Sequence, residues 1–159
     1  MAMLSFPTQK VGAGAVDVTA TLDPDDKVWL EGDDRPQGPG IGVEGRLSVA
    51  GPGRYYFSGT IDGEVSRQCG RCLNEFNATL SAEMHVLFAD GEHAVDDDPD
   101  VFPLAQGRSG AEIDLRPAVR EGWLLEVPAI AVCRPDCKGL CATCGANLNQ
   151  GTCTCARKP

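Results

Sequence analysis

Apolar and polar residues alternate strictly in the middle of the chain. In "NATLSAEMHVLFA", residues 77–89, one face would hold apolar side chains and the other polar ones. A period of two is typical of a strand with one buried face. The apolar positions are Leu80, Ala82, Met84, Val86 and Phe88, and the polar positions are Thr79, Ser81, Glu83 and His85.

A second alternating stretch, "RYYFSGTIDGEVSR", residues 54–67, places Tyr55, Phe57, Gly59 and Ile61 on one face. The segment "QCGRCLN" lies between the two stretches, so we expect it to form the tip of an antiparallel hairpin. Residues 41–51 also resemble a strand, and Val16, Val18 and Ala20 give a weaker strand signal. The Pro- and Gly-rich "DDRPQGPGIG" predicts a loop. We expect the acidic stretch from Asp90 to about Gly110 to be a mobile connection.

One segment has the period of a helix. In "AEIDLRPAVREGWLLEVP", an apolar stripe is formed by Val119, Trp123, Leu124 and Val127. Asp114 is the expected cap, Pro117 would lie in the first turn, and Pro128 would end the helix. The predicted fold is therefore α+β, mainly antiparallel β, with one C-terminal helix and a zinc-ribbon-like cysteine tail. We expect a mainly β domain over residues 1–132 and a cysteine-rich tail over residues 133–159.

Composition narrows the functional classes. The chain has 159 residues and a net charge of −9, which argues against a sequence-blind binder of nucleic acid. The charge is uneven, because from Arg116 onward six basic residues face three acidic ones. We find neither a secretory signal nor a membrane span, so the cytoplasm is the expected location. Thiols stay reduced there, and paired cysteines then favour metal binding or redox chemistry over disulfides.

Six of the eight cysteines lie between Cys133 and Cys155, in "CRPDCKGLCATCGANLNQGTCTC". Only Leu140 and Leu148 are large and apolar there, which is too little to offset the ordering entropy of the segment. A four-thiolate zinc site supplies roughly 10–16 kcal/mol of apparent binding energy in small peptides, enough to fold such a tail.

The spacing suggests two sites. Cys141 and Cys144 have the Cys-x-x-Cys spacing of a zinc knuckle, with Gly145 next, and Cys153 and Cys155 supply a second pair. The remaining thiols, Cys69, Cys72, Cys133 and Cys137, would form another four-sulfur site. Another grouping joins Cys137, Cys141 and Cys144 with one of the last two cysteines. A single metal site with spare thiols, or a chain without metal, also stays open.

The chemistry of these sites indicates structure rather than catalysis. Two fully thiolate-ligated sites leave no open coordination position, and the sequence holds no catalytic arrangement that we recognise. His85 and His93 are expected to be solvated, and Trp29 and Trp123 to anchor the core. The form of "CGRC" is also that of a thioredoxin active site, but its flanks alternate like strands, whereas that site needs a helix start.

The chain resembles the YceD family, the large ribosomal RNA subunit accumulation proteins. The likeness is carried by "CGRCL", "EIDLRPAVREGWLLEVP" and "CKGLCATCGANLNQGTCTC", and it spans about residues 15 to 155. It implies a bacterial, cytoplasmic, non-enzymatic role in the accumulation or assembly of the large ribosomal subunit. Ribosomal RNA or large-subunit ribosomal proteins would be the partners, with no membrane and no small-molecule substrate.

Four basic residues neighbour the first cysteine group. If its cysteines share a metal, these bases converge into a small patch suited to phosphate or a ribosomal surface: Arg67, Arg71, Arg134 and Lys138. Alternatively, they only compensate the charge of the sulfurs. The leading hypothesis is thus a zinc-stabilised assembly factor with two zinc ions. A protein–protein adaptor that never touches RNA is the alternative, and a thiol oxidoreductase is a third.

Overall fold

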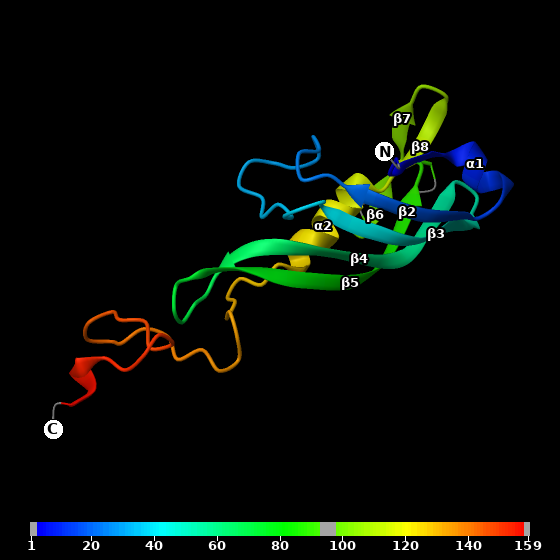
Figure 1. Ribbon diagram of the computed structural model, residues 1–159. Helices are drawn as coiled ribbons and strands as arrows, with labels where there is room; N and C mark the ends of the chain where they lie inside the picture. Colours follow the sequence, from blue (N-terminus) through cyan, green and yellow to red (C-terminus); the bar gives the residue numbers. More distant parts are fainter. Residues whose placement is uncertain (1–2, 93–97, 158–159) are drawn as a thin grey trace.

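The computed structural model describes residues 3–92 and 98–157 and contains two sheets. The larger sheet has the strand order β2-β3-β4-β5-β6, and the smaller has the order β1-β8-β7 (Figure 1). The elements are β1 (Ser5–Pro7), α1 (Thr8–Ala13), β2 (Val16–Leu22), β3 (Ile41–Gly51), β4 (Arg54–Gln68), β5 (Glu75–Ala89), β6 (Val101–Pro103), β7 (Ala105–Gly107), β8 (Gly110–Asp114), α2 (Arg116–Glu126) and the 3₁₀ turn η1 (Thr154–Arg157).

The chain is therefore α+β and mainly antiparallel β, as predicted. Helix α2 covers one face of the larger sheet, and the smaller sheet lies at the end remote from the cysteine tail (Figure 1). The tail continues beyond the tip of the β4–β5 hairpin. Among the described residues, no helix combines the length and the apolar character needed to cross a bilayer.

The β4–β5 hairpin is the longest regular feature of the fold. Its register runs without a shift from Arg54 opposite Ala89 to Gln68 opposite Glu75. The predicted faces are confirmed, since Phe57, Ile61 and Val86 are buried, whereas the alternate side chains from Thr60 to Ser66 and from Glu75 to His85 are exposed. The hairpin thus carries "CGRC" at its tip, away from the body of the sheet.

Helix α2 lies against the inner face of this hairpin. The ring of Trp123 is 1% exposed and lies against Gly63 of β4, and its Nε1–H donates to the carbonyl of Asp34 at 2.8 Å. Arg120 forms two hydrogen bonds with the Asp33 carboxylate, at 2.7 and 2.9 Å. These bonds fix the long loop between β2 and β3 onto the helix, and Trp29 in that loop is buried as expected.

The predicted N-cap of the helix was wrong by one residue. Asp114 is the last residue of β8, and the N-cap position is taken by Leu115, which is fully buried and donates its N–H to the carbonyl of Leu4. Pairing of β8 with β1 holds the backbone extended as far as Asp114. Its carboxylate still accepts the N–H of Arg116 at 3.0 Å, so it satisfies one free donor of the first turn.

The expectation of a featureless connection between Asp90 and Gly110 was also wrong in part. The connection contains β6 and β7, and β8 begins at Gly110. These short strands have too few residues to show a period, and β8 pairs with β1 from the other end of the chain. The helix α1 was not predicted either. His93, Asp96 and Asp97 lie outside the described residues.

Candidate metal centres

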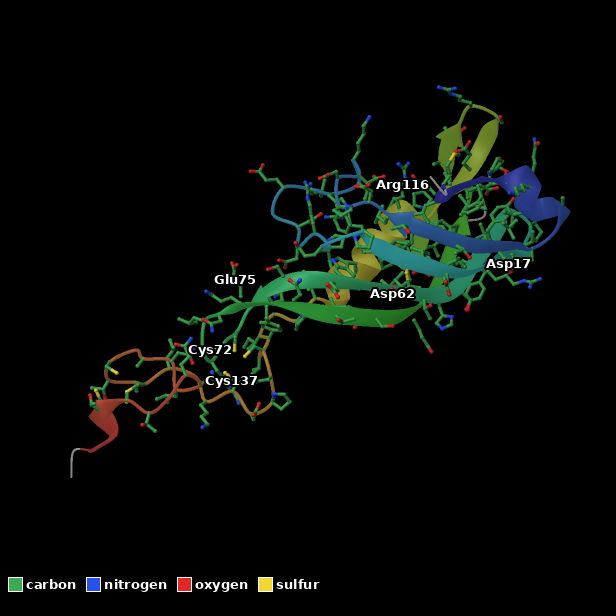
Figure 2. The ribbon with its side chains drawn as sticks, viewed as in Figure 1. Asp17, Asp62, Cys72, Glu75, Arg116 and Cys137 are labelled. Carbon is green, nitrogen blue, oxygen red and sulfur yellow. The ribbon has the colours of Figure 1, made fainter. Side chains whose placement is uncertain are left out.

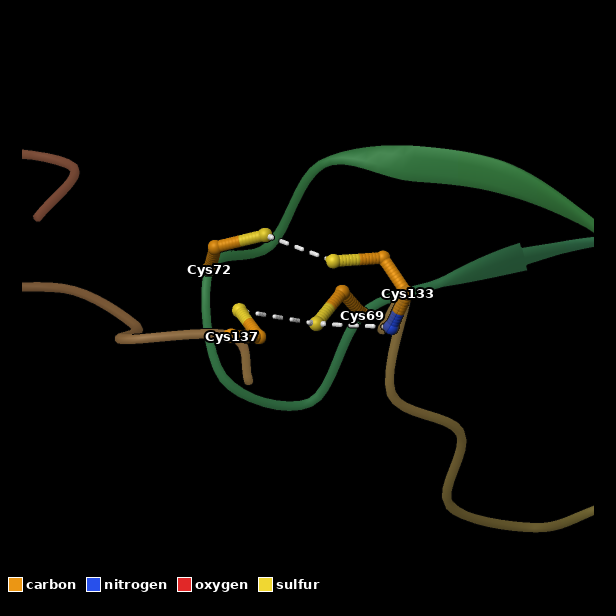
Figure 3. Close-up of side chains that lie close together, drawn as sticks. All are labelled: Cys69, Cys72, Cys133 and Cys137. Carbon is orange, nitrogen blue, oxygen red and sulfur yellow. Dashed lines mark hydrogen bonds between the residues drawn. The ribbon is translucent and has the colours of Figure 1, made fainter. Parts of the chain in front are cut away.

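Four cysteines from distant parts of the chain meet at the hairpin tip (Figure 3). We call Cys69, Cys72, Cys133 and Cys137 the first centre. The Sγ atoms of Cys69 and Cys137 are 3.8 Å apart, as are those of Cys72 and Cys133, and all four sulfurs lie within 4.8 Å of one another. Cys69, Cys72 and Cys137 are buried. The first centre therefore joins the hairpin to the segment that follows α2.

Main-chain bonds hold these two segments together. Cys69 forms a parallel bridge with Ala131, and the N–H of Gly70 donates to the carbonyl of Ala131 at 2.8 Å. The Arg71 guanidinium donates to the carbonyls of Pro135 and Cys137 at 3.3 and 3.2 Å. Phe76 and Val132 pack against the buried thiols. The sulfurs are thus positioned by backbone pairing and by a small apolar shell.

The last four cysteines form the second centre: Cys141, Cys144, Cys153 and Cys155. Their Sγ atoms also lie within 4.8 Å of one another, and Cys144 is exposed. The loop around Cys141 is closed by a hydrogen bond from the N–H of Gly145 to the Cys141 carbonyl at 2.9 Å. The N–H of Thr143 points at the Cys141 Sγ at 3.4 Å.

The two Cys-x-x-Cys loops have the same local geometry. In the first, the N–H of Leu73 donates to the Cys69 carbonyl at 2.9 Å and that of Arg71 points at the Cys69 Sγ at 3.4 Å. The residue after the second cysteine is left-handed in both loops, with φ of 61° at Leu73 and 74° at Gly145. Glycine takes this conformation without a steric cost, whereas leucine does not. The first loop therefore keeps the knuckle geometry despite an unfavourable residue.

Both centres fit a tetrahedral metal. Zinc–sulfur bonds of about 2.3 Å in a tetrahedron separate the sulfurs by about 3.8 Å. That matches the separation of the Cys69 and Cys137 Sγ atoms and far exceeds the roughly 2.05 Å of a disulfide. The eight thiols could supply four sulfur ligands to each centre, and such a set would leave no place for water. The two clusters could thus each hold one metal ion.

Electrostatics also favour a cation at each centre. Backbone N–H groups of Cys72 and Cys133 lower the pKa of Cys69 to about 6, and those of Cys144 and Thr143 lower the pKa of Cys141 to about 6. Burial and the neighbouring sulfurs raise the pKa of Cys133 to about 12, and the Cys144 sulfur together with burial raises that of Cys155 to about 11. Without a cation, some of the four thiols at each centre would therefore remain protonated.

The predicted basic patch is only partly assembled. Arg67 forms an ion pair with Asp34 at 2.9 Å, and its side chain is 19% exposed. Arg134 contacts Asp136 at 3.3 Å. Arg71 is engaged with tail carbonyls, as described above. Lys138 is exposed, and among the described residues no acidic group is paired with its ammonium.

Sequence reasoning missed Asn149, which connects the two centres. It lies in the loop of the second centre, yet its Nδ2–H donates to the Cys137 Sγ at 3.3 Å. Its Oδ1 accepts from the N–H of Lys138 at 2.9 Å and from Arg134 at 2.8 Å. Nothing in the spacing of the cysteines singles out this residue, because its role depends on how the two loops fold against each other.

The geometry around "CGRC" differs from that of a redox active site. Cys69 comes directly after β4, and the next residues form the turn of the hairpin, so no described helix begins at this cysteine. Lowering of a thiol pKa by a helix N-terminus, which such enzymes use, has no source here. The hydrogen bonds at Cys69 come instead from the knuckle and from Cys133.

Comparison with known proteins finds a matching family and several relatives. The family model described as "Large ribosomal RNA subunit accumulation protein YceD" matches residues 57–159, which include both centres. A maize protein named as a chloroplastic homologue of that protein is 48% identical over 68 residues, 42% of this chain and 22% of the maize protein. An Arabidopsis thaliana protein of the same name is 45% identical over 47 residues, 30% of this chain and 15% of that protein.

Bacterial relatives cover more of the chain. An uncharacterized protein of Mycobacterium tuberculosis is 35% identical over 92 residues, which is 57% of this chain and 44% of that protein. The chain therefore spans less than half the length of these curated relatives. No solved structure matches it.

Proposed function

The chain belongs to the YceD family of large ribosomal RNA subunit accumulation proteins, and from this premise we propose that it is a zinc-stabilised, non-enzymatic factor for the accumulation of that RNA. We place it in the bacterial cytoplasm, where the large ribosomal subunit is assembled. Its partners would be ribosomal RNA or large-subunit ribosomal proteins. The maize relative, named as a homologue, supports the role, and the cysteine centres support the metal.

The observation that carries this proposal is the pair of four-sulfur centres. Each would bind one zinc ion through four thiolates, as structural zinc sites do, and zinc would supply a cross-link rather than a reactive position. The first centre would fix the tail to the hairpin tip, and the second would fold residues 141–155. In this arrangement residues 133–159 form a zinc-binding tail on the mainly β domain of residues 1–132.

The basic residues near the first centre have separate roles in this proposal. Lys138 is exposed and would contact phosphate. Arg71 and Arg134 hold tail atoms and offer their remaining donors to the same surface. Arg67 is committed to Asp34, so we assign it to holding the loop between β2 and β3.

The function can be tested in the bacterium that carries the gene. We expect its deletion to lower the ratio of large-subunit to small-subunit ribosomal RNA, measured on total RNA. Wild-type protein should restore the ratio, and so should Ser66→Ala, an exposed change on β4 outside both centres. Cys72→Ser should not restore it, because it removes a sulfur from the first centre. An unchanged ratio after deletion would contradict the proposed role.

The adaptor alternative is favoured by the net charge of −9, which suits a basic protein better than RNA. Cosedimentation with ribosomal particles separates the two. If the chain contacts RNA, its association should fall steeply between about 50 and 200 mM salt and should be lost after ribonuclease treatment. An association that survives ribonuclease would mean that the contact is made through protein, and Lys138→Ala would then have no effect.

A further inference from the structure

The outer edge of β5 is open over most of its length. β6 pairs with β5 only at Leu87, Phe88 and Ala89, whereas β4 pairs with its other edge along the whole strand. Within the described part of the chain, no strand therefore borders β5 from Glu75 to Val86. In an antiparallel strand, every second residue directs its N–H and C=O away from its partner. In Figure 1, β5 accordingly forms the border of the larger sheet between the body and the tail.

This edge lacks the features that usually protect an exposed strand. Residues 75–86 contain no lysine, proline or glycine, and the register with β4 has no bulge along this segment. By contrast, β3 carries a register shift between Val49 and Gly51. Natural edge strands are commonly shortened, bulged or marked with lysine, because an open and regular edge invites another strand.

Side chains on the two sides of the edge differ sharply. Within segments 58–68 and 75–85, every second side chain lies on the open face of the hairpin. The charged side chains of lysine, arginine, aspartate or glutamate on this face are all acidic: Asp62, Glu64, Glu75 and Glu83 (Figure 2 labels Asp62 and Glu75). On the opposite face, Ala78, Leu80 and Ala82 form a half-buried apolar row beside the core. A strand added to β5 would thus meet acids on one face and apolar groups on the other.

The acids also argue against a second copy of this chain at the edge. In an antiparallel pair centred on Thr79, Glu75 of one copy would lie opposite Glu83 of the other, twice over. Like charges directly opposite destabilise a strand pair. A segment that brings positive charge avoids this repulsion and pairs favourably with Glu75 and Glu83.

We propose that the open edge of β5 binds an extended, lysine- or arginine-rich segment of a protein partner, which adds to the sheet as an antiparallel or parallel strand. Its basic side chains lie over the acidic face, and its alternate apolar side chains contact the row at Ala78, Leu80 and Ala82. Main-chain hydrogen bonds supply affinity, and the alternation supplies specificity. This surface begins beside the first centre, where Phe76 packs against the thiols, but the proposed contacts at Glu83 and at the row of Ala78, Leu80 and Ala82 involve no cysteine, so the inference does not require a bound metal.

The test uses the full chain and a synthetic ten-residue peptide of alternating lysine and valine with blocked ends. Binding is measured by calorimetry, and amide hydrogen exchange is followed by NMR. We expect slowed exchange at alternate amides between Asn77 and Val86. Reversing both edge acids, Glu75→Lys with Glu83→Lys, should weaken binding about tenfold, which corresponds to about 1.4 kcal/mol shared by the two cross-strand charge pairs. The control pair, Glu121→Lys with Glu126→Lys, makes the same charge change on exposed positions of α2 and should bind nearly as wild type.

Three further probes can overturn the inference. A peptide with glutamate in place of lysine should not bind, and equal binding would exclude recognition of charge. A peptide that keeps every lysine but has proline at the valine positions cannot pair as a strand, so equal binding would exclude strand addition. Protection of the same β5 amides by an RNA oligonucleotide would mean that RNA binds this edge. Self-association that is lost in the double variant would mean that a second copy of the chain binds it. Either result would contradict the proposal.

Discussion

Replacing Cys72 with serine should remove one metal ion from the chain and leave another bound. The wild-type protein, purified without chelator, should hold two zinc ions, one for each group of four sulfurs. A tetrahedral site that loses one thiolate binds zinc far more weakly, and the binding energy of such a site is roughly 10–16 kcal/mol in small peptides. Elemental analysis of the desalted variant should therefore give a stoichiometry near one.

Replacing Cys137 with serine should remove the same ion, although 65 residues separate it from Cys72 (137 − 72). Both sulfurs belong to the first centre, so the double variant should be little worse than either single variant in metal content and in melting temperature. Cys144→Ser is the matched control, because it makes the same atomic change in the second centre. It should release the other ion and leave the hairpin tip fixed to the segment after α2.

Two results would contradict this arrangement. Retention of two ions by Cys72→Ser would mean that this sulfur is not a ligand. Additive losses in the double variant, down to no metal, would mean that Cys72 and Cys137 serve different sites. Amide exchange at Gly70, whose N–H donates to Ala131, reports directly on whether the tip has come loose.

The regular part of the fold was predictable because its signals are local. Residues 54–67 and 77–89 alternate over many positions, and a pattern of that length leaves little choice except a hairpin with one buried face. Helix α2 was found because its apolar stripe and Pro117 agree. The small sheet was not found, because three-residue strands such as β1 and β7 show no period, and the pairing of β1 with β8 joins distant parts of the chain.

The cysteine groups followed from counting, whereas their surroundings did not. Spacing assigns Cys141 and Cys144 to one loop and offers Cys153 and Cys155 as a second pair, and the four remaining thiols have few alternatives. The basic patch inferred from sequence neighbours stays a prediction for Arg71, Arg134 and Lys138, whereas Arg67 is paired with Asp34, on a loop that α2 holds in place. Neighbours in sequence indicate which charges are near a site, but only the packing decides which of them are already paired.

The last expected result concerns Asn149, which joins the centres through its amide. Changing it to aspartate keeps an oxygen to accept from Lys138 and Arg134 but removes the N–H that points at the Cys137 Sγ. It also puts a negative charge beside a group of thiolates. Residues that hydrogen-bond to metal ligands typically contribute 10–100-fold to metal affinity. We therefore expect Asn149→Asp to weaken zinc binding at the first centre by about that factor and to leave the second centre nearly unchanged.

Asn147→Asp is the matched control for this change. It adds the same charge two residues away, at a side chain whose Oδ1 accepts the N–H of Asn149 at 2.9 Å and can still accept it as a carboxylate. Titration with a competing chelator, followed by the order in which the two ions leave, measures both affinities in each variant. If both variants weaken the first centre equally, the cause is the added charge. If Asn149→Asp alone does so, the amide N–H at the Cys137 sulfur stabilises the centre, and the second cysteine loop then contributes to the metal affinity of the first.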